Sequence, residues 1–205
     1  MPSDRLRASL LQSYDSAEER DLIRALLEMH VADTDLWKAF DSKGLKAALK
    51  DPKRESDLRK PVKNYLKDEW GLDRIAAEVP LPSKSSHSAS KADIVGFKKR
   101  LLGARQAYAV ELKSEISRGA VRQAFAQAKE YQRHCEYSTA CISPLLYMNF
   151  IEELDHELTH NEYEGVGVWV GNSDRVLVEL RKPSINQIQN EDRDPMFDWI
   201  ATHEY

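Results

Sequence analysis

Three charged residues stand in segments that otherwise have the composition of buried strands. Asp93 precedes one apolar run, and Glu111 and Lys113 follow another and flank only Leu112. Charges in such positions are costly to bury unless they are paired. Two carboxylates are hard oxygen ligands for a divalent cation, and a lysine ammonium can orient water or neutralise charge on a phosphate. These are the groups that metal-assisted phosphodiester hydrolysis requires.

The strands that carry these residues must bring them to one place. In Glu111-Leu112-Lys113 the strand period of two puts Glu111 and Lys113 on one face and turns Leu112 to the core. Asp93 on a neighbouring strand would meet them at one edge of the sheet. Alternation and turn signals predict strands at 74–82, 92–97, 106–115, 139–148, 165–172 and 175–183. Helical spacing predicts helices at 55–71, 117–137 and 149–160, and shorter helices within 1–50.

Two segments, ADIVGF (92–97) and AVELKSE (109–115), resemble the PD-(D/E)xK nuclease superfamily. Its signature is an Asp on one strand, an acidic-x-Lys on the next strand and a helix after it. Glu111 follows Asp93 by 18 positions, which leaves room for a hairpin, and Ala92 stands where many members have Pro. The resemblance implies that Asp93, Glu111 and Lys113 are catalytic. It also implies that Asp93 and Glu111 hold Mg²⁺, for which Mn²⁺ would substitute.

Gln127 and Tyr131 extend the resemblance on the helix expected after the lysine strand. They are similar to the Gln-xxx-Tyr element of RecB-like nucleases, which implies substrate-binding residues close to the active site. At i and i+4 both side chains lie on one helix face, each with a hydrogen-bonding tip. Either residue could instead mark a plain amphipathic boundary.

Further acidic residues are weaker candidates. Glu55 resembles the helix-borne acid that many members place before the first strand, and we count it with the catalytic set. Asp57 occupies the same helix turn and is an alternative to it. Glu78 is a candidate extra ligand from the first strand, and Glu115 is expected to be exposed at a strand end. His156 and His160 have a metal-binding spacing but no third ligand, so we interpret them as surface residues.

A basic segment lies between the two motif strands. Residues 98 to 105 include four Lys or Arg and no acidic residue. Lys98, Lys99 and Arg100 are either a solvated hairpin turn or contacts to substrate phosphates near the site, and the sequence favours neither reading.

These patterns predict an α/β fold: a restriction-endonuclease-like mixed β-sheet core flanked by helices, with an N-terminal helical extension. The expected divisions are a helical extension at 1–50, a nuclease-like core at 51–183 and a polar C-terminal tail at 184–205 with an aromatic patch. By analogy with members that cut two strands as dimers, the N-terminal helices are a candidate homodimer interface.

Composition and charge restrict the classes of protein to which the chain can belong. The chain has 205 residues, 41% hydrophobic and 31% charged, which is typical of a globular protein. The formal net charge of −4 does not indicate a nucleic-acid binder, but a local basic surface remains compatible with it. Two cysteines are too few for a four-cysteine metal site, and no segment is apolar enough for a signal peptide or membrane span. We therefore expect a cytoplasmic protein without a membrane partner.

The sequence thus predicts a Mg²⁺-dependent nuclease acting on nucleic acid, with DNA as the first choice of substrate. One alternative is a catalytically inactive nucleic-acid-binding or scaffold module of the same fold. Another is a protein unrelated to nucleic acid in which the three charges form a structural ion-pair cluster.

Overall fold

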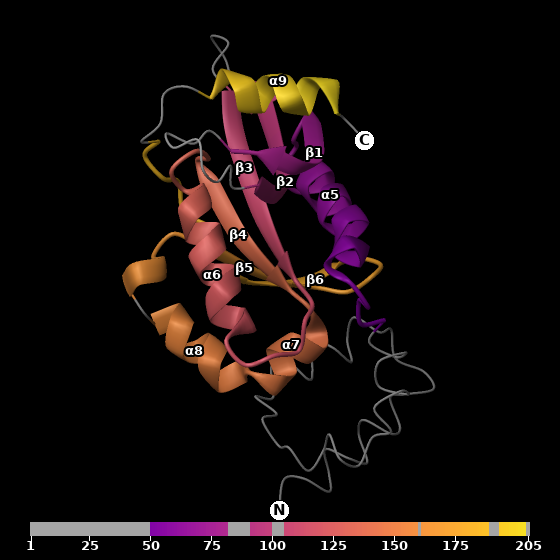
Figure 1. Cartoon of the computed structure of the whole chain (residues 1–205), viewed down its shortest axis with the longest axis vertical. Coiled ribbons are helices and arrows are strands. Elements are labelled where there is room, and N and C mark those ends of the chain that lie inside the picture. Colours follow the sequence, from indigo (N-terminus) through magenta and orange to yellow (C-terminus); the bar gives the residue numbers. More distant parts are fainter. Residues whose placement is uncertain (1–49, 82–90, 100–104, 160, 189–192, 204–205) are drawn as a thin grey trace, which may run out of the picture.

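The computed structural model describes residues 50–81, 91–99, 105–159, 161–188 and 193–203. Its centre is a six-stranded mixed sheet in the order β1-β2-β3-β4-β5-β6, flanked by helices (Figure 1). The predicted α/β class is therefore confirmed. The strands are β1 (Arg74–Pro80), β2 (Lys91–Lys99), β3 (Arg105–Lys113), β4 (Tyr137–Ile142), β5 (Gly167–Gly171) and β6 (Val176–Arg181). The helices are η1 (Glu55–Leu58), α5 (Arg59–Asp68), α6 (Ala120–Tyr131), α7 (Pro144–Asn149), α8 (Ile151–Thr159), η3 (Asn161–Tyr163) and α9 (Asp194–Thr202).

The sheet changes from antiparallel to parallel at β3. Strands β1, β2 and β3 form an antiparallel meander. β3 pairs with β4 in parallel, and β4 pairs with β5 in parallel, so each connection must cross over the sheet. Helix α6 makes the first crossover, and α7 and α8 lie in the second. β6 then closes the far edge antiparallel to β5.

Helices cover both faces of this sheet. Val62 and Leu66 of α5 pack with Leu112 of β3 and Trp169 of β5 on one face. Helices α6, α7 and α8 pack on the opposite face of β4 and β5. Because both faces are covered, β3 is buried along most of its length, which explains the apolar run from Ala107 to Val110 at its centre.

Prolines set two helix starts. Pro61 lies in the first turn of α5, directly after the 3-10 helix η1, where its missing N–H needs no partner. The strand expected at 139–148 was predicted too long, because β4 ends at Ile142. Ser143 then caps α7, accepting a hydrogen bond from the Leu146 N–H at 3.2 Å, and Pro144 occupies the first helical position.

The segment expected as a polar tail contains helix α9, which the sequence did not predict. Met196, Phe197 and Ile200 are buried in a cluster with side chains of β1, β2 and β3. The Phe197 ring meets the Phe97 ring edge to face, with centroids 5.1 Å apart. Arg193, just before the helix, lies 3.0 Å from the Glu136 carboxylate. Residues near the end of the chain therefore contribute to the core.

Several expectations lie outside the described residues. These are the helices and dimer interface of the N-terminal extension up to residue 49, and residues 100–104 of the expected hairpin turn. Within the described part of the chain, every helix is too short or too polar to cross a bilayer.

Candidate active site

The sheet opens between β2 and β3 at the point where the motif residues lie. The β2–β3 ladder runs from Lys99↔Arg105 to Ile94↔Val110 and is not continued beyond that pair. Past it, β2 remains paired with β1, and β3 remains paired with β4. The Asp93 side chain enters the opening, and its Oδ2 accepts a hydrogen bond from the Leu112 N–H at 2.8 Å. A carboxylate thus replaces the backbone acceptor that a regular ladder would provide.

Glu111 lies beside Asp93 and is almost fully buried, with 4% of its surface exposed. The hydroxyl of Tyr131, at the end of α6, donates a hydrogen bond to Glu111 Oε2. The same hydroxyl oxygen lies 3.2 Å from the carbonyl oxygen of Lys91 at the start of β2. Tyr131 therefore connects α6 to both strands of the opening.

The two neighbouring carboxyl groups resist ionisation. Burial, and then the charge of Asp93, raises the pKa of Glu111 to about 8, although the Tyr131 hydrogen bond and Lys113 oppose this rise. Burial is also the main cause that raises the pKa of Asp93, and Glu55 and Glu78 add to it. Without a cation between them, both groups favour the protonated form more than an exposed acid does.

Lys113 completes the predicted trio from the same face of β3 as Glu111. Its Nζ lies 2.9 Å from Glu55 Oε1 on η1. The alternative acid, Asp57, points elsewhere, because its Oδ2 accepts hydrogen bonds from the N–H groups of Lys53 and Arg54 at 3.0 and 3.1 Å. Of the two acids on this helix turn, the structure brings Glu55 to the trio.

Glu78 of β1 lies near the same opening but is engaged with another residue. Its backbone has a φ of +54°, an unusual value for a side-chain-bearing residue in a strand. Its carboxylate forms an ion pair with Arg59 of α5. Sequence reasoning did not single out Arg59, since an ion pair between a helix and a strand 19 positions apart has no local signature. Glu115, as expected, is exposed.

The donor set of the opening fits a hard divalent cation. Mg²⁺ in proteins is commonly held by one or two carboxylates, and water and substrate phosphate oxygens fill the other positions. Asp93 and Glu111 provide two such carboxylates, and their mutual repulsion is what a bound cation would relieve. No group of three or more His, Cys, Asp or Glu within the described ranges is arranged to hold a metal ion. The protein here offers two acidic ligands rather than a complete cage.

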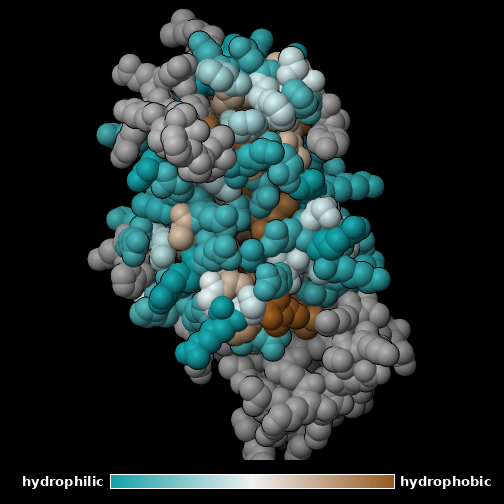
Figure 2. All heavy atoms as spheres, in the orientation of Figure 1, coloured by the Kyte–Doolittle hydropathy of each residue, from teal (hydrophilic) through white to brown (hydrophobic). Residues whose placement is uncertain are grey.

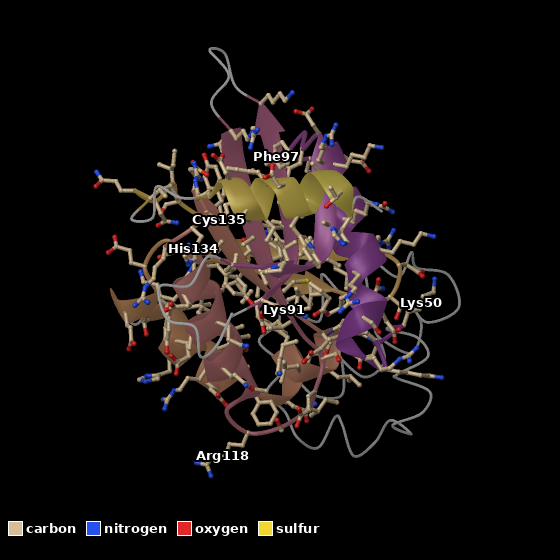
Figure 3. The ribbon with its side chains drawn as sticks, turned by 45° about the horizontal axis from the view of Figure 1, so that its top comes forward. Lys50, Lys91, Phe97, Arg118, His134 and Cys135 are labelled. Atoms are coloured by element: carbon tan, nitrogen blue, oxygen red, sulfur yellow. The ribbon has the colours of Figure 1, made fainter. Side chains whose placement is uncertain are left out.

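The structure does not bring the other predicted substrate contacts to this opening. Lys98 and Lys99 belong to β2 itself rather than to a turn, and at about 3.3 Å per residue Lys99 lies about 20 Å along the strand from Asp93. Lys98 Nζ donates to the Trp70 carbonyl at 3.1 Å. In Figure 3, Lys91 marks the site end of β2, and Phe97 lies toward the other end, near α9. Arg100 falls outside the described residues. The expectation that this basic segment lies near the site is therefore wrong for Lys98 and Lys99.

Gln127 and Tyr131 differ in their surroundings. Tyr131 lies at the site, where it contacts Glu111. The Oε1 atom of Gln127 is buried and has no hydrogen-bond partner among the described residues. His156 of α8 is exposed, as expected, and His160 is not described.

Comparison of the chain with models of protein families, with curated proteins and with solved structures gives no match in any of the three.

Proposed function

We propose that this protein is a metal-dependent nuclease that hydrolyses phosphodiester bonds in DNA. The observation that carries the proposal is the meeting of two carboxyl groups, half-buried Asp93 and buried Glu111, with the Lys113 ammonium where the β2–β3 ladder ends. Such a pair of neighbouring acids withdrawn from solvent has a physical reason to exist when a cation and a phosphate occupy the opening.

We further assign the core to the restriction-endonuclease-like fold. Asp93 lies on one strand of an antiparallel pair, Glu111 and Lys113 lie on the next, and α6 follows that strand. This succession agrees with the signature of the PD-(D/E)xK superfamily. The acid-bearing η1 comes before the first strand, as in the members that Glu55 resembles.

Each residue of the site has a distinct part in the proposed reaction. Asp93 and Glu111 would hold Mg²⁺ or Mn²⁺, which supplies positive charge to the scissile phosphate. Lys113 orients the attacking water and offsets the negative charge that develops on the phosphate oxygens in the transition state. The Leu112 N–H fixes Asp93, and the Tyr131 hydroxyl fixes Glu111. Glu55 holds the Lys113 side chain.

A cleavage panel tests the proposal. The purified protein is incubated with Mg²⁺ or Mn²⁺ and with supercoiled, linear duplex, single-stranded and branched DNA, and with RNA. We expect cleavage of at least one DNA form, and a loss of at least 100-fold in Asp93→Asn and in Lys113→Ala. The first substitution removes a charged ligand of the proposed metal site, and the second removes the positive charge that would stabilise the transition state. Glu115→Gln is the matched control because Glu115 is an exposed acid two positions beyond Lys113.

Two results would count against the nuclease. Wild-type protein that cuts none of these substrates, but binds them equally well with and without metal, would indicate the inactive binding module. Cleavage that survives unchanged in Asp93→Asn would place the activity elsewhere or in a contaminant.

A further inference from the structure

A cationic cavity adjoins the candidate active site. It has a volume of about 380 Å³ and lies between α5 and the strands β1 and β2. Its rim carries the basic side chains of Arg59, Lys60 and Lys63, and its floor is apolar and includes Ile75 and Ile94. The described residues that line it include no acid. Figure 2 shows hydrophobic atoms between hydrophilic groups on the face where α5 and the strands lie in Figure 1.

Three links connect the lining of this cavity to the residues of the opening. Ser56 of its lining follows Glu55, which holds Lys113. Ile94 of its floor follows Asp93 along β2. Arg59 of its rim forms an ion pair with Glu78, whose charge helps to raise the pKa of Asp93. A chain-like ligand bound at the opening would therefore extend into the cavity.

The chemistry of the lining suits one segment of a nucleic-acid strand. Lysine and arginine are the principal contacts to phosphate oxygens, and an apolar floor suits the sugar and the face of a base. The Arg59 guanidinium pairs with Glu78, so Lys60 and Lys63 are the candidate lining cations for an anionic oxygen. The volume lies within the usual range for ligand pockets, about 300–1,000 Å³.

We propose that this cavity binds the phosphodiester next to the scissile one, with its nucleoside on the apolar floor. The inference rests on the proposed nuclease function and adds the path of the substrate strand to it. Lys60 and Lys63 contact the phosphate, and Ala77 and Ile94 contact the nucleoside. These residues determine substrate affinity, whereas Asp93 and Lys113 determine the chemical step.

Binding of a fluorescent single-stranded oligonucleotide, measured by anisotropy in EDTA over a range of salt, tests this path. We expect Lys60→Ala/Lys63→Ala to raise Kd about tenfold at moderate salt. The slope of log Kd against log salt should fall by about 1.4, because each single-strand phosphate contact contributes about 0.7. In Mg²⁺ the same variant should raise KM and keep kcat.

Two further variants separate the cavity from a general basic surface. Lys67 is exposed on the same helix but does not line the cavity, so Lys67→Ala should leave Kd within about twofold. Ala77→Ile fills the floor without changing charge and should weaken binding by about as much as the double lysine variant. Equal weakening by Lys67→Ala, or unchanged binding in Ala77→Ile, would overturn the proposal.

The result is distinguishable from a failure of the nuclease proposal. Loss of cleavage in Asp93→Asn with unchanged cleavage in the cavity variants would leave the nuclease standing and reject the cavity. Weakened binding in the cavity variants together with no cleavage by wild type would reject the nuclease and leave a strand-binding cavity.

Discussion

Lys113 Nζ lies 2.9 Å from Glu55 Oε1, so the pair joins the motif strand β3 to the 3-10 helix η1 that precedes the sheet. The lysine side chain is only 11% exposed, and the glutamate is 39% exposed. The Lys113 ammonium is therefore paired with a more exposed carboxylate, which belongs to η1 and not to the two motif strands. This arrangement makes Glu55 a positioning residue for Lys113, and its charge also helps to raise the pKa of Asp93.

Glu55→Gln should slow cleavage about 10–100-fold, the usual effect of losing a partner that orients an active-site group. The amide keeps the shape of the side chain but removes the charge that holds Lys113. Steady-state kinetics should show the loss in kcat, with little change in KM. Asp57→Asn is the matched control, since that carboxylate accepts only from backbone N–H groups of Lys53 and Arg54 among its described hydrogen bonds. A larger kinetic effect in Asp57→Asn would reverse the assignment of the two acids.

Tyr131→Phe should weaken Mg²⁺ or Mn²⁺ binding about 10–100-fold. The hydroxyl donates to Glu111 and lowers its pKa, so its removal makes the proton on Glu111 harder to displace. Metal titration followed by calorimetry measures the change. The phenylalanine keeps the packing of the buried ring, and melting without metal should confirm that the fold is intact. Equal metal affinity in both proteins would mean that Tyr131 has only a structural part.

Local sequence predicted the elements of the core because their signals are local. The alternation around Leu112 and the apolar runs of β2 and β3 predict strands. If these two strands form a hairpin, Asp93 and Glu111 come to lie opposite each other. The opening of the ladder beyond Ile94 was not predictable in the same way, because it depends on an Asp93 carboxylate reaching the Leu112 N–H on another strand. The Lys113–Glu55 ion pair joins segments 58 positions apart, so no local periodicity in the sequence indicates it.

The errors have physical causes as well. Lys98 and Lys99 were assigned to a turn because a charged run resembles one, yet both continue the β2 ladder opposite Gln106 and Arg105. Helix α9 is short and follows a polar segment, so its few apolar positions do not repeat often enough to indicate a helix. Its three buried side chains, Met196, Phe197 and Ile200, become informative only when the sheet they cover is known.

The metal-free protein should lose stability as the pH rises toward 8. In the folded state Glu111 keeps its proton up to about pH 8, whereas an unfolded glutamate loses it near pH 4.3, about its ordinary value. Between these values the folded state binds more protons, so the free energy of unfolding falls with rising pH, by up to about 1.4 kcal/mol per pH unit. Below about pH 4 the protonated Glu111 makes its full contribution to the free energy of unfolding.

Glu111→Gln provides the control for this pH dependence because its amide does not titrate. Urea unfolding in EDTA between pH 5 and 8 should show a decline in wild type that the variant lacks. Parallel curves for the two proteins would mean that Glu111 ionises at its ordinary pKa in the folded state.

Mg²⁺ should stabilise the folded protein, because the proposed site exists only where the fold brings Asp93 and Glu111 together. At 100 times its Kd the ion would add about 2.7 kcal/mol to the free energy of unfolding. Thermal melting should show the shift in wild type and Lys113→Ala and lose it in Asp93→Asn. A structural ion-pair cluster gives the opposite pattern: Lys113→Ala melts much lower, and metal has no effect on any of the proteins.

Phe197→Ala should destabilise the protein by about 3–5 kcal/mol, the usual range for a buried phenylalanine. The ring is 4% exposed and meets Phe97 edge to face, and the guanidinium carbon of Arg105 lies 4.8 Å from its centroid. Asp198→Ala, at the next position and exposed, should change the unfolding free energy by less than about 0.5 kcal/mol. Urea unfolding of both variants measures the difference. Equal stability of the two would mean that α9 does not contribute to the core, in agreement with the polar tail that the sequence predicts.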